Sequence, residues 1–192
     1  MIGAIIGDIV GSKFEFQPIK CKNFLLFSEE SDYTDDSLMT IAVGLALKQA
    51  FADKKENDAA FLQDQFIRTM QSIGRSYPNP AGAYGSAFSQ WLVTKNPEPY
   101  NSWGNGAAMR ISACGELAES LEEARFFAEQ SAIVSHNHPE GIKGAQAIAV
   151  AIFLAKQGKS KEEIRHYIYQ YFYPERLTVE EIRPHYSFDP SC

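Results

Sequence analysis

Cysteine is scarce in this sequence of 192 residues, and no zinc-binding pattern takes its place. The three cysteines, Cys21, Cys114 and Cys192, form no CxxC pair, and the four histidines complete no zinc-ligand spacing. A mononuclear zinc module is therefore excluded. An odd number of widely separated cysteines is typical of a reducing compartment.

Positive charge is also in short supply. The 18 Lys and Arg side chains stand against 24 Asp and Glu side chains, which gives a formal net charge of −6 with no basic run. Binding to nucleic acid depends on clustered Lys and Arg side chains. The composition therefore excludes nucleic acid as a partner.

Long apolar runs are absent as well. The longest, around residues 145–155, is too short and too polar at its edges to span a bilayer. The apolar start of the chain is interrupted by Asp8 and has no basic segment, so no signal peptide is expected. These absences predict a cytoplasmic protein with no membrane partner.

The most prominent pattern in the sequence is helical periodicity. Within residues 37–50, apolar residues recur at helical spacing, at Leu38, Ile41, Ala42, Leu45 and Ala46. Further helices are predicted over residues 58–73, 121–134, 139–157 and 164–172. No alternating strand pattern is present, and the length suits one domain, so we predict an all-α fold in a single domain.

Start and stop signals support these helices. Asn57 is the predicted start of the second helix, and Gly74 is predicted to end it. Pro139 suits a first helical position, and Gly158 suits the stop that follows. Capping boxes pair a hydroxyl with a Glu three residues later, and they are predicted at Ser120/Glu123, Ser160/Glu163 and Thr178/Glu181.

The first candidate site is the segment GDIVGSKFE, which carries Asp8 and Glu15. Seven residues are almost two helical turns, so both carboxylates are predicted to lie on one stripe of a helix. Gly11 and Ser12 leave that side open to a ligand. The alternative is close helix packing at Gly7 and Gly11, with two ordinary surface or capping charges.

The second candidate site is YTDDS, just before the helix predicted over residues 37–50. Asp35, Asp36 and Ser37 place two carboxylates and a hydroxyl in a short span. Such hard oxygen donors suit Mg²⁺, Mn²⁺ or Ca²⁺. The alternative is helix capping, which favours the same residues.

Two loops complete the candidates. Gly104, Asn105 and Gly106 precede a predicted helical stretch and offer backbone N–H groups to an anion, although a plain glycine-rich turn is the more common explanation of such a pattern. His136 and His138, two residues apart, do not share a helical face. They fit either a ligand-contacting loop or a polar connection between helices.

Taken together and in this order, these motifs resemble the ADP-ribosylglycohydrolase family, which includes dinitrogenase reductase-activating glycohydrolase and the ADP-ribosyl-acceptor hydrolases. The resemblance rests on GDIVGSKFEF, YTDDS, the loop containing AYG, WGNGAAMR and SHNHPEGIKGAQAIA. It implies an all-α fold of that type. It also implies a metal-dependent hydrolase that cleaves the glycosidic bond of ADP-ribosylated proteins or ADP-ribose derivatives.

The resemblance also implies roles for individual residues. Thr34, Asp35 and Asp36 would bind Mg²⁺ or Mn²⁺, two ions in the family. Glu15 would be the catalytic base, gate or water-positioning group, and Asp8 a structural partner behind the metal ligands. The implied substrate-binding residues are Tyr84, Gly85, Gly104, Asn105, Gly106, Ala107, Ser135, His136 and His138.

One family element has no counterpart in the sequence. The family carries a later Gly-Gly-Asp-x-Asp run, which supplies further metal ligands. We therefore expect residues 1–192 to form an incomplete domain that lacks the C-terminal helices, holds one ion or none, and self-associates through exposed apolar surface. The alternative function is a catalytically impaired or inactive homologue acting as an ADP-ribose- or nucleotide-binding module or through protein contacts.

Overall fold

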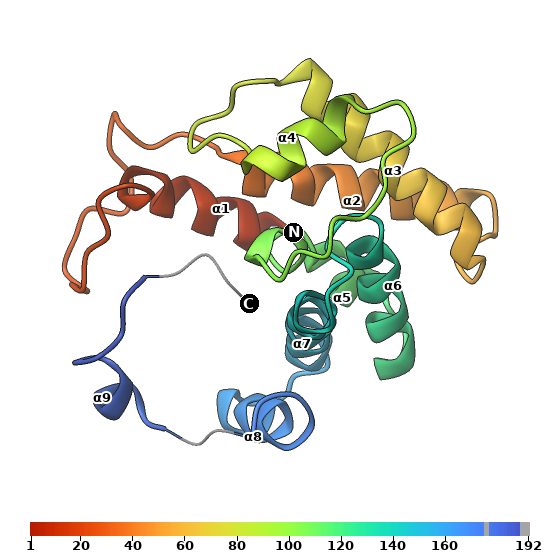
Figure 1. The fold of residues 1–192 in the computed structure, drawn as a ribbon. Helices are drawn as coiled ribbons and strands as arrows, with labels where there is room; N and C mark the ends of the chain where they lie inside the picture. The colour runs from red at the N-terminus through yellow and green to blue at the C-terminus, as the bar shows by residue number, and fades with distance from the viewer. Residues whose placement is uncertain (175–176, 189–192) are drawn as a thin grey trace.

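The structure is a computed structural model that describes residues 1–174 and 177–188. Within these residues the chain is helical and contains no β-strand, which confirms the all-α prediction (Figure 1). The α-helices are α1 (Ile2–Gly11), α2 (Asp35–Ala52), α3 (Ala59–Ser76), α4 (Ser86–Val93), α5 (Ser112–Leu117), α6 (Leu121–Ile133), α7 (Pro139–Lys156), α8 (Lys161–Tyr171) and α9 (Val179–Ile182). Two 3-10 turns, η1 (Ser12–Phe14) and η2 (Asn105–Ala107), lie between them.

Helix α2 is the centre of the core. It packs against α1, α3 and α5, and its buried side chains include Met39, Val43 and Leu47. Small residues at Ala42 and Ala46 let neighbouring helices approach closely. Helices α6 and α7 form a second pair, with α5 packed against both (Figure 1).

The buried face of α2 differs from the predicted stripe. Leu38, Ala42 and Ala46 are buried as expected, but Ile41 is 38% exposed and Leu45 is 47% exposed. Met39 and Val43 are buried in their place. Because α2 has apolar residues on most of its circumference, periodicity alone could not decide which of them face the core.

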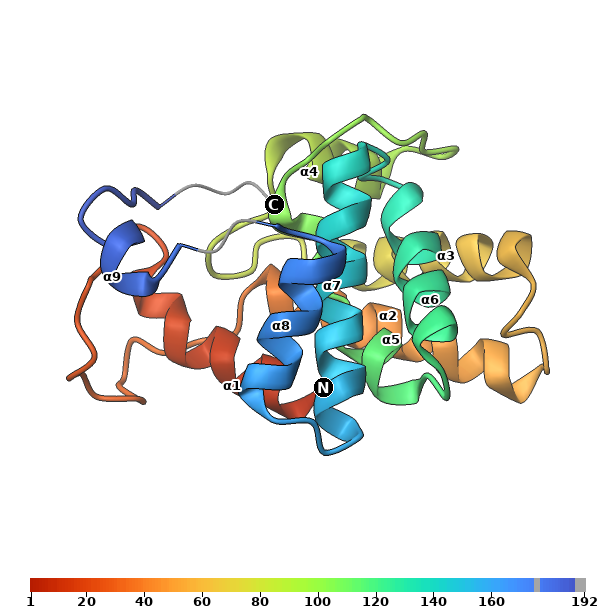
Figure 2. The same cartoon turned by 90° about the horizontal axis from the view of Figure 1, so that it is seen from below.

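A smaller apolar cluster joins α7 to α8. Val150 and Leu154 of α7 pack with Phe172, which follows α8, and Ile164 and Ile168 cover this cluster. The two helices lie side by side in both views (Figures 1 and 2). This cluster attaches the C-terminal part of the described chain to the main core.

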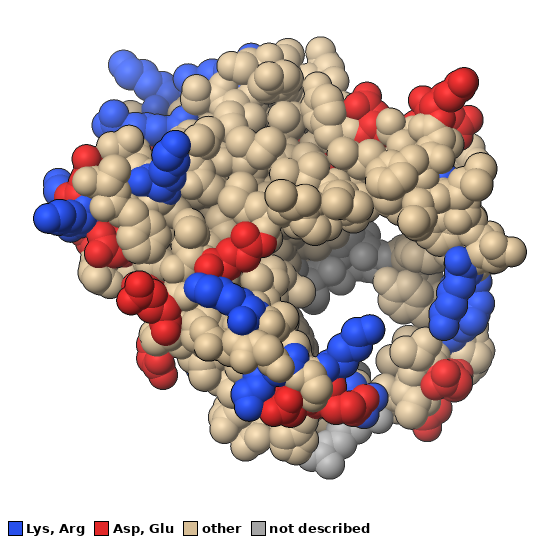
Figure 3. Space-filling model, turned by 180° about the vertical axis from the view of Figure 1, so that it is seen from behind, with Lys and Arg blue, Asp and Glu red and all other residues tan. Residues whose placement is uncertain are grey.

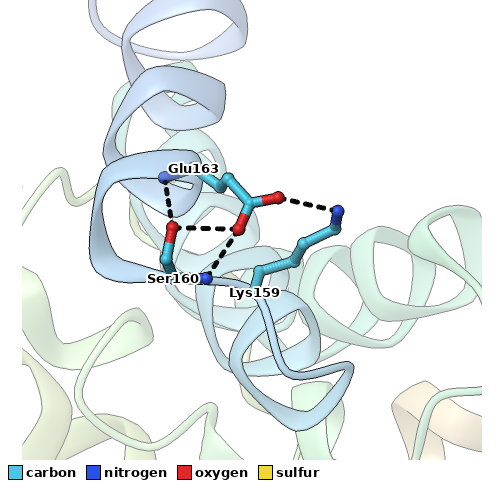
Figure 4. A network of polar contacts seen from close by, with 3 residues as sticks. All are labelled: Lys159, Ser160 and Glu163. Atoms are coloured by element: carbon cyan, nitrogen blue, oxygen red, sulfur yellow. Dashed lines mark hydrogen bonds and ion pairs between the residues drawn. The ribbon is translucent and has the colours of Figure 1, made fainter.

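The predicted helix ends are largely confirmed. The capping boxes at Ser160/Glu163 and Thr178/Glu181 are complete, and Lys159 extends the first of them by pairing with Glu163 (Figure 4). At Ser120 only half of the box forms, because the Glu123 carboxylate accepts from the Glu119 N–H instead. Pro139 opens α7 as predicted, and Gly158 follows its end with φ of 79°.

The predicted ends of α3 are wrong. The helix starts after Asp58, whose carboxylate accepts from the Phe61 N–H at 3.1 Å, so Asn57 is not the cap. Gly74 lies inside the helix, where it is buried against Leu92. Because Gly74 has no side chain, α3 and α4 can pack closely at this point. Gly74 does not end the helix.

The segment between η1 and α2 runs along the surface and meets the C-terminal segment. The Lys20 ammonium donates to the carbonyl oxygens of Arg183 and Tyr186, and the Arg183 guanidinium donates back to the Lys20 carbonyl. Figure 3 shows this side of the molecule hollowed, with charged residues of both signs around its edge. No helix within residues 1–174 and 177–188 is long and apolar enough to cross a bilayer.

Gly115 provides a test of the α5–α7 contact. A Cβ atom at this position would clash with the Ala149 carbonyl oxygen and would lie 2.8 Å from the Cβ of Ile152. We expect Gly115→Ala to lower the free energy of unfolding by about 1–3 kcal/mol, because overpacking at a backbone contact cannot be relieved by a side-chain rotation. The melting temperature measured by circular dichroism should fall accordingly.

Gly7→Ala in α1 is the matched control, since nothing lies within 4 Å of a Cβ at that position. Its free energy of unfolding should stay level or rise by up to about 1 kcal/mol, because alanine has the higher helix propensity. Its melting temperature should therefore not fall. Equal melting temperatures for Gly115→Ala and the wild type would show that the α5–α7 contact is looser than described.

Candidate functional site

The site is built on the Asp8 carboxylate, which joins α1 to the first turn of α2. One oxygen accepts from the Thr34 N–H at 2.9 Å, the Ser37 N–H at 3.1 Å and the Ser37 hydroxyl. The other oxygen accepts from the Thr34 hydroxyl at 2.6 Å. Backbone N–H groups at a helix start need such partners, so one carboxylate both caps α2 and fixes its direction.

Thr34 is the N-cap residue of α2. Its hydroxyl oxygen accepts from the Asp36 N–H at 3.2 Å while its hydrogen goes to Asp8, and the side chain is buried. The hydroxyl thus has two partners within the protein. Asp35 and Asp36 follow it in the first turn, where the helix start favours negative charge.

Glu15 also lies near the start of α2, but it is not part of the same α-helix as Asp8. Helix α1 ends at Gly11, and a 3-10 turn leads to Glu15, so Asp8 and Glu15 do not share an α-helical stripe and that prediction is wrong. Both carboxylates nevertheless raise the pKa of Asp36 by repulsion, so each of them lies close to that side chain at the start of α2.

The loop between α3 and α4 also lies against the start of α2 and against Glu15. A parallel bridge joins Thr34 to Ala81, and Gly82 follows with φ of 80°. A Cβ at Gly82 would lie 3.5 Å from the Thr34 Cβ and 3.6 Å from the Glu15 Cδ. These are ordinary van der Waals distances, so the positive φ explains why glycine occupies the position.

These elements surround a cavity of about 490 Å³, a size typical of ligand sites. Its wall includes nine of the residues implied by the family resemblance: Glu15, Asp35, Asp36, Tyr84, Gly85, Gly104, Asn105, Gly106 and His136. A larger hollow of about 820 Å³ lies between α8 and α9, and its wall contains none of the predicted site residues.

Five predicted residues are not part of the cavity wall: Asp8, Thr34, Ala107, Ser135 and His138. Ala107 and Ser135 are buried beside it. His138 caps α7 by accepting from the Glu140 N–H at 3.1 Å, and its ring packs edge-on against Trp103. Asn105 and Gly106 belong to η2, and the next α-helix, α5, begins only at Ser112. The Gly104 N–H donates to the Ser102 hydroxyl at 3.1 Å.

Sequence reasoning missed three large residues of the wall: Phe88, Tyr100 and Arg110. Arg110 ends the WGNGAAMR motif, so its place beside the glycine loop was a signal that was available. Phe88 and Tyr100 carry no local signal, because only the packing of α4 and the following loop against His136 brings them to the cavity.

The carboxylates on the cavity wall are partly buried and repel one another. Burial, followed by repulsion from Asp36 and Glu15, raises the pKa of Asp35 to about 7. Burial, followed by repulsion from Asp8 and Glu15, raises the pKa of Asp36 to about 6. Every charged group that acts on these two carboxyls is itself a carboxylate, so the pair lacks a compensating cation.

The donor set therefore has the chemistry of a hard-cation site. Asp35 and Asp36 offer two carboxylates at the cavity wall, with Glu15 nearby, and a divalent ion would relieve their repulsion. No cluster of three or more His, Cys, Asp or Glu side chains with metal-binding geometry occurs in the described part of the chain. Asp35 and Asp36 are two candidate ligands, and an ion bound to them would take its remaining ligands from water or from ligand oxygens.

Another part of the wall is basic and aromatic. Arg110 is 0% exposed, and its guanidinium lies 5.8 Å above the Phe88 ring. Burial, with the nearby Arg110 charge, lowers the pKa of His136 to about 3, so this imidazole is neutral across the physiological range. The cavity thus combines an acidic region with hydrogen-bond donors and aromatic faces.

The raised pKa of Asp35 predicts how stability depends on pH in the absence of metal. Below an unfolded value of about 4 the carboxyl is protonated in both states, whereas above about 7 its charge destabilises the folded state fully. Asp35→Asn should therefore stabilise the metal-free protein by roughly 1–2 kcal/mol at pH 8, or about 2–8 °C in melting temperature. This gain should disappear near pH 4.

Asp64→Asn is the control, because the Asp64 side chain on α3 is half-exposed and pairs with Arg68 at 2.8 Å. Its melting temperature should differ little from that of the wild type, and the difference should not grow with pH. A destabilised Asp35→Asn protein at pH 8 would contradict the proposed repulsion.

Comparison with known proteins shows which family the sequence matches. Residues 1–186 match the model of the ADP-ribosylglycohydrolase family. ADP-ribosylhydrolase ARH3 of Mus musculus is 28% identical over 200 residues, covering 88% of this chain and 51% of the relative. The Homo sapiens protein of that name is 27% identical, with 88% and 52% covered, and the Gallus gallus protein is 26% identical, with 85% and 51% covered.

The chain spans about half the length of the curated relatives it matches. The family match extends over nearly all of it, from α1 to the end of the described C-terminal segment, and includes every element of the cavity. The chain belongs to the ADP-ribosylglycohydrolase family.

Proposed function

We propose that this chain binds an ADP-ribose group in the cavity and hydrolyses its glycosidic bond, with a divalent cation at Asp35 and Asp36. The observation that carries the proposal is a carboxylate pair without a counter-cation, on the wall of a cavity that also holds aromatic rings and neutral donors. The name of these relatives, ADP-ribosylhydrolase, supports this substrate class.

The acidic region is the proposed reaction centre. Asp35 and Asp36 would hold Mg²⁺ or Mn²⁺, an ion that would bind sugar hydroxyls and favour ionisation of a water molecule. Glu15 is the proposed base, because its carboxylate lies on the same wall and can take a proton from the attacking water. Positive charge develops on the ribose ring as the bond breaks, and the surrounding carboxylates stabilise it.

The rest of the wall is the proposed recognition region. The segment Gly104–Gly106 lets ligand phosphates approach the backbone, and Tyr100 provides an aromatic face for the adenine ring. Asp8 and Thr34 act from behind the wall by fixing the start of α2. Burial keeps the Tyr100 hydroxyl protonated, since it raises the pKa of that group to about 12.

A second candidate function is an ADP-ribose- or nucleotide-binding module without turnover. It is favoured by the position of Thr34, whose hydroxyl is bonded to Asp8, because the cavity then has few protein ligands for a cation. Such a module would bind ADP-ribose with or without metal and release no product. Binding and turnover therefore have to be measured separately.

Removing the carboxylate pair separates the two functions. With Mg²⁺ or Mn²⁺ present, the Asp35→Asn/Asp36→Asn variant should hydrolyse an ADP-ribosylated peptide at least about 100-fold more slowly, because the metal contribution is lost. Calorimetry should show one cation per wild-type chain and none in the variant. Asp64→Asn, which alters a half-exposed residue on α3 outside the cavity wall, is the control and should match the wild type.

Full turnover by the double variant would exclude the proposed metal site. If the wild-type protein binds ADP-ribose but never releases product, the second candidate function, a binding module without turnover, would be supported instead.

Glu15→Gln tests the proposed base. The substitution keeps the shape of the side chain but removes its capacity to accept a proton, so kcat should fall by roughly 10²–10⁴-fold, while KM changes less than severalfold. Glu30→Gln is the control, because Glu30 is exposed in the same N-terminal segment. A wild-type kcat for Glu15→Gln would remove Glu15 from the mechanism.

A further inference from the structure

Arg110 is a buried cation without a carboxylate partner in the described part of the chain. Its Nε donates to the Ser131 hydroxyl at 3.3 Å, and its Nη2 donates to the Ser131 carbonyl and, at 3.0 Å, to the Ser135 hydroxyl. Its Nη1 is buried with no partner among these residues. A buried, unpaired charge is costly, and these hydrogen bonds offset part of that cost.

The Ser135 hydroxyl links Arg110 to His136. Its oxygen lies 3.0 Å from Arg110 Nη2 and 2.9 Å from His136 Nδ1, and the residue is fully buried. A guanidinium has no acceptor, so the Ser135 oxygen must accept from it. The hydroxyl hydrogen also needs an acceptor, and His136 Nδ1 is the one in reach among the described residues.

This chain of bonds decides which ring nitrogen of His136 carries hydrogen. If Nδ1 accepts from Ser135, a neutral imidazole must carry its hydrogen on Nε2. The opposite tautomer would direct two donors at the Ser135 oxygen and leave a buried hydroxyl hydrogen without a partner. Arg110 therefore acts on His136 through Ser135, and its positive charge also opposes protonation of the ring.

The Nε2 atom lies at the cavity wall beside Gly106. A Cβ at Gly106 would lie 2.7 Å from Nε2, so only glycine leaves room there. The ring is held by Tyr100, whose centroid is 5.3 Å away, and by the His136 N–H, which donates to the Ala132 carbonyl at 2.8 Å. No described residue accepts a hydrogen bond from Nε2, which leaves its hydrogen for a ligand.

We infer that Arg110 and Ser135 are positioning residues that fix His136 as the Nε2–H tautomer, so that it donates a hydrogen bond to a phosphate oxygen of the bound ligand. The inference rests on the proposed function, since that function brings the diphosphate of ADP-ribose to the Gly106 loop. The same arrangement disfavours a ligand that presents a donor at this point, because Nε2–H and Arg110 have no acceptor to offer it.

Nitrogen-15 NMR of the histidine side chains tests the tautomer directly at pH 7. Wild-type His136 should show the pattern of hydrogen on Nε2 and a bare Nδ1. In Ser135→Ala both tautomers should appear, and ADP-ribose measured by calorimetry should bind about 5–10-fold more weakly, as expected for one lost charge-assisted hydrogen bond. Ser135→Thr keeps the hydroxyl and should restore both readouts.

Ser131→Ala is the matched control, because it removes another hydroxyl partner of Arg110 without touching His136. Its His136 spectrum should match the wild type. Hydrogen on Nδ1 in the wild type, or an unchanged tautomer in Ser135→Ala, would overturn the inference, and the wild-type spectrum alone suffices if the variant does not fold. A wild type with the expected tautomer that binds no ADP-ribose would refute the proposed function and the phosphate contact, but not the Arg110–Ser135–His136 arrangement.

Discussion

The arrangement of the cavity depends on the Asp8 carboxylate, which takes four hydrogen bonds from Thr34 and Ser37 at the start of α2. These bonds fix where the most buried helix begins and leave the next two side chains, Asp35 and Asp36, on the cavity wall. The same turn carries the bridge to Ala81, which brings in the loop before α4. A helix cap thus sets the geometry of the candidate reaction centre.

The same constraint explains the electrostatic cost of the site. Holding Asp8, Glu15, Asp35 and Asp36 close together raises the pKa values of the last two, and no positive group compensates them. This repulsion lowers the free energy of unfolding of the metal-free protein, and a bound divalent ion would restore the lost stability. On the other part of the wall, Arg110 is held by serine oxygens rather than by a carboxylate, so its charge stays available to order His136.

Local sequence signals predicted much of this structure. The helices, the complete capping boxes and the TDD element follow from residues close in sequence, and nine of the residues implied by the family resemblance lie on one wall. The errors arise where tertiary packing decides. The helix breaks at Gly11, so Glu15 arrives through a 3-10 turn, and Gly74 serves a contact with Leu92. Arg110 was overlooked because its role depends on Ser135, which α6 brings to it from 25 residues away.

The central claim is that the capped start of α2 presents a specific cation site. Mn²⁺ added in small amounts to ¹⁵N-labelled protein broadens the amide signals of residues near the bound ion, and so locates it without any need for turnover. We expect the signals of Asp35 and Asp36 to disappear first, followed by those of Glu15 and Gly82, and we expect Asp35→Asn/Asp36→Asn to abolish this order. Broadening centred elsewhere, such as the hollow between α8 and α9, or an unchanged pattern in the variant, would contradict this claim.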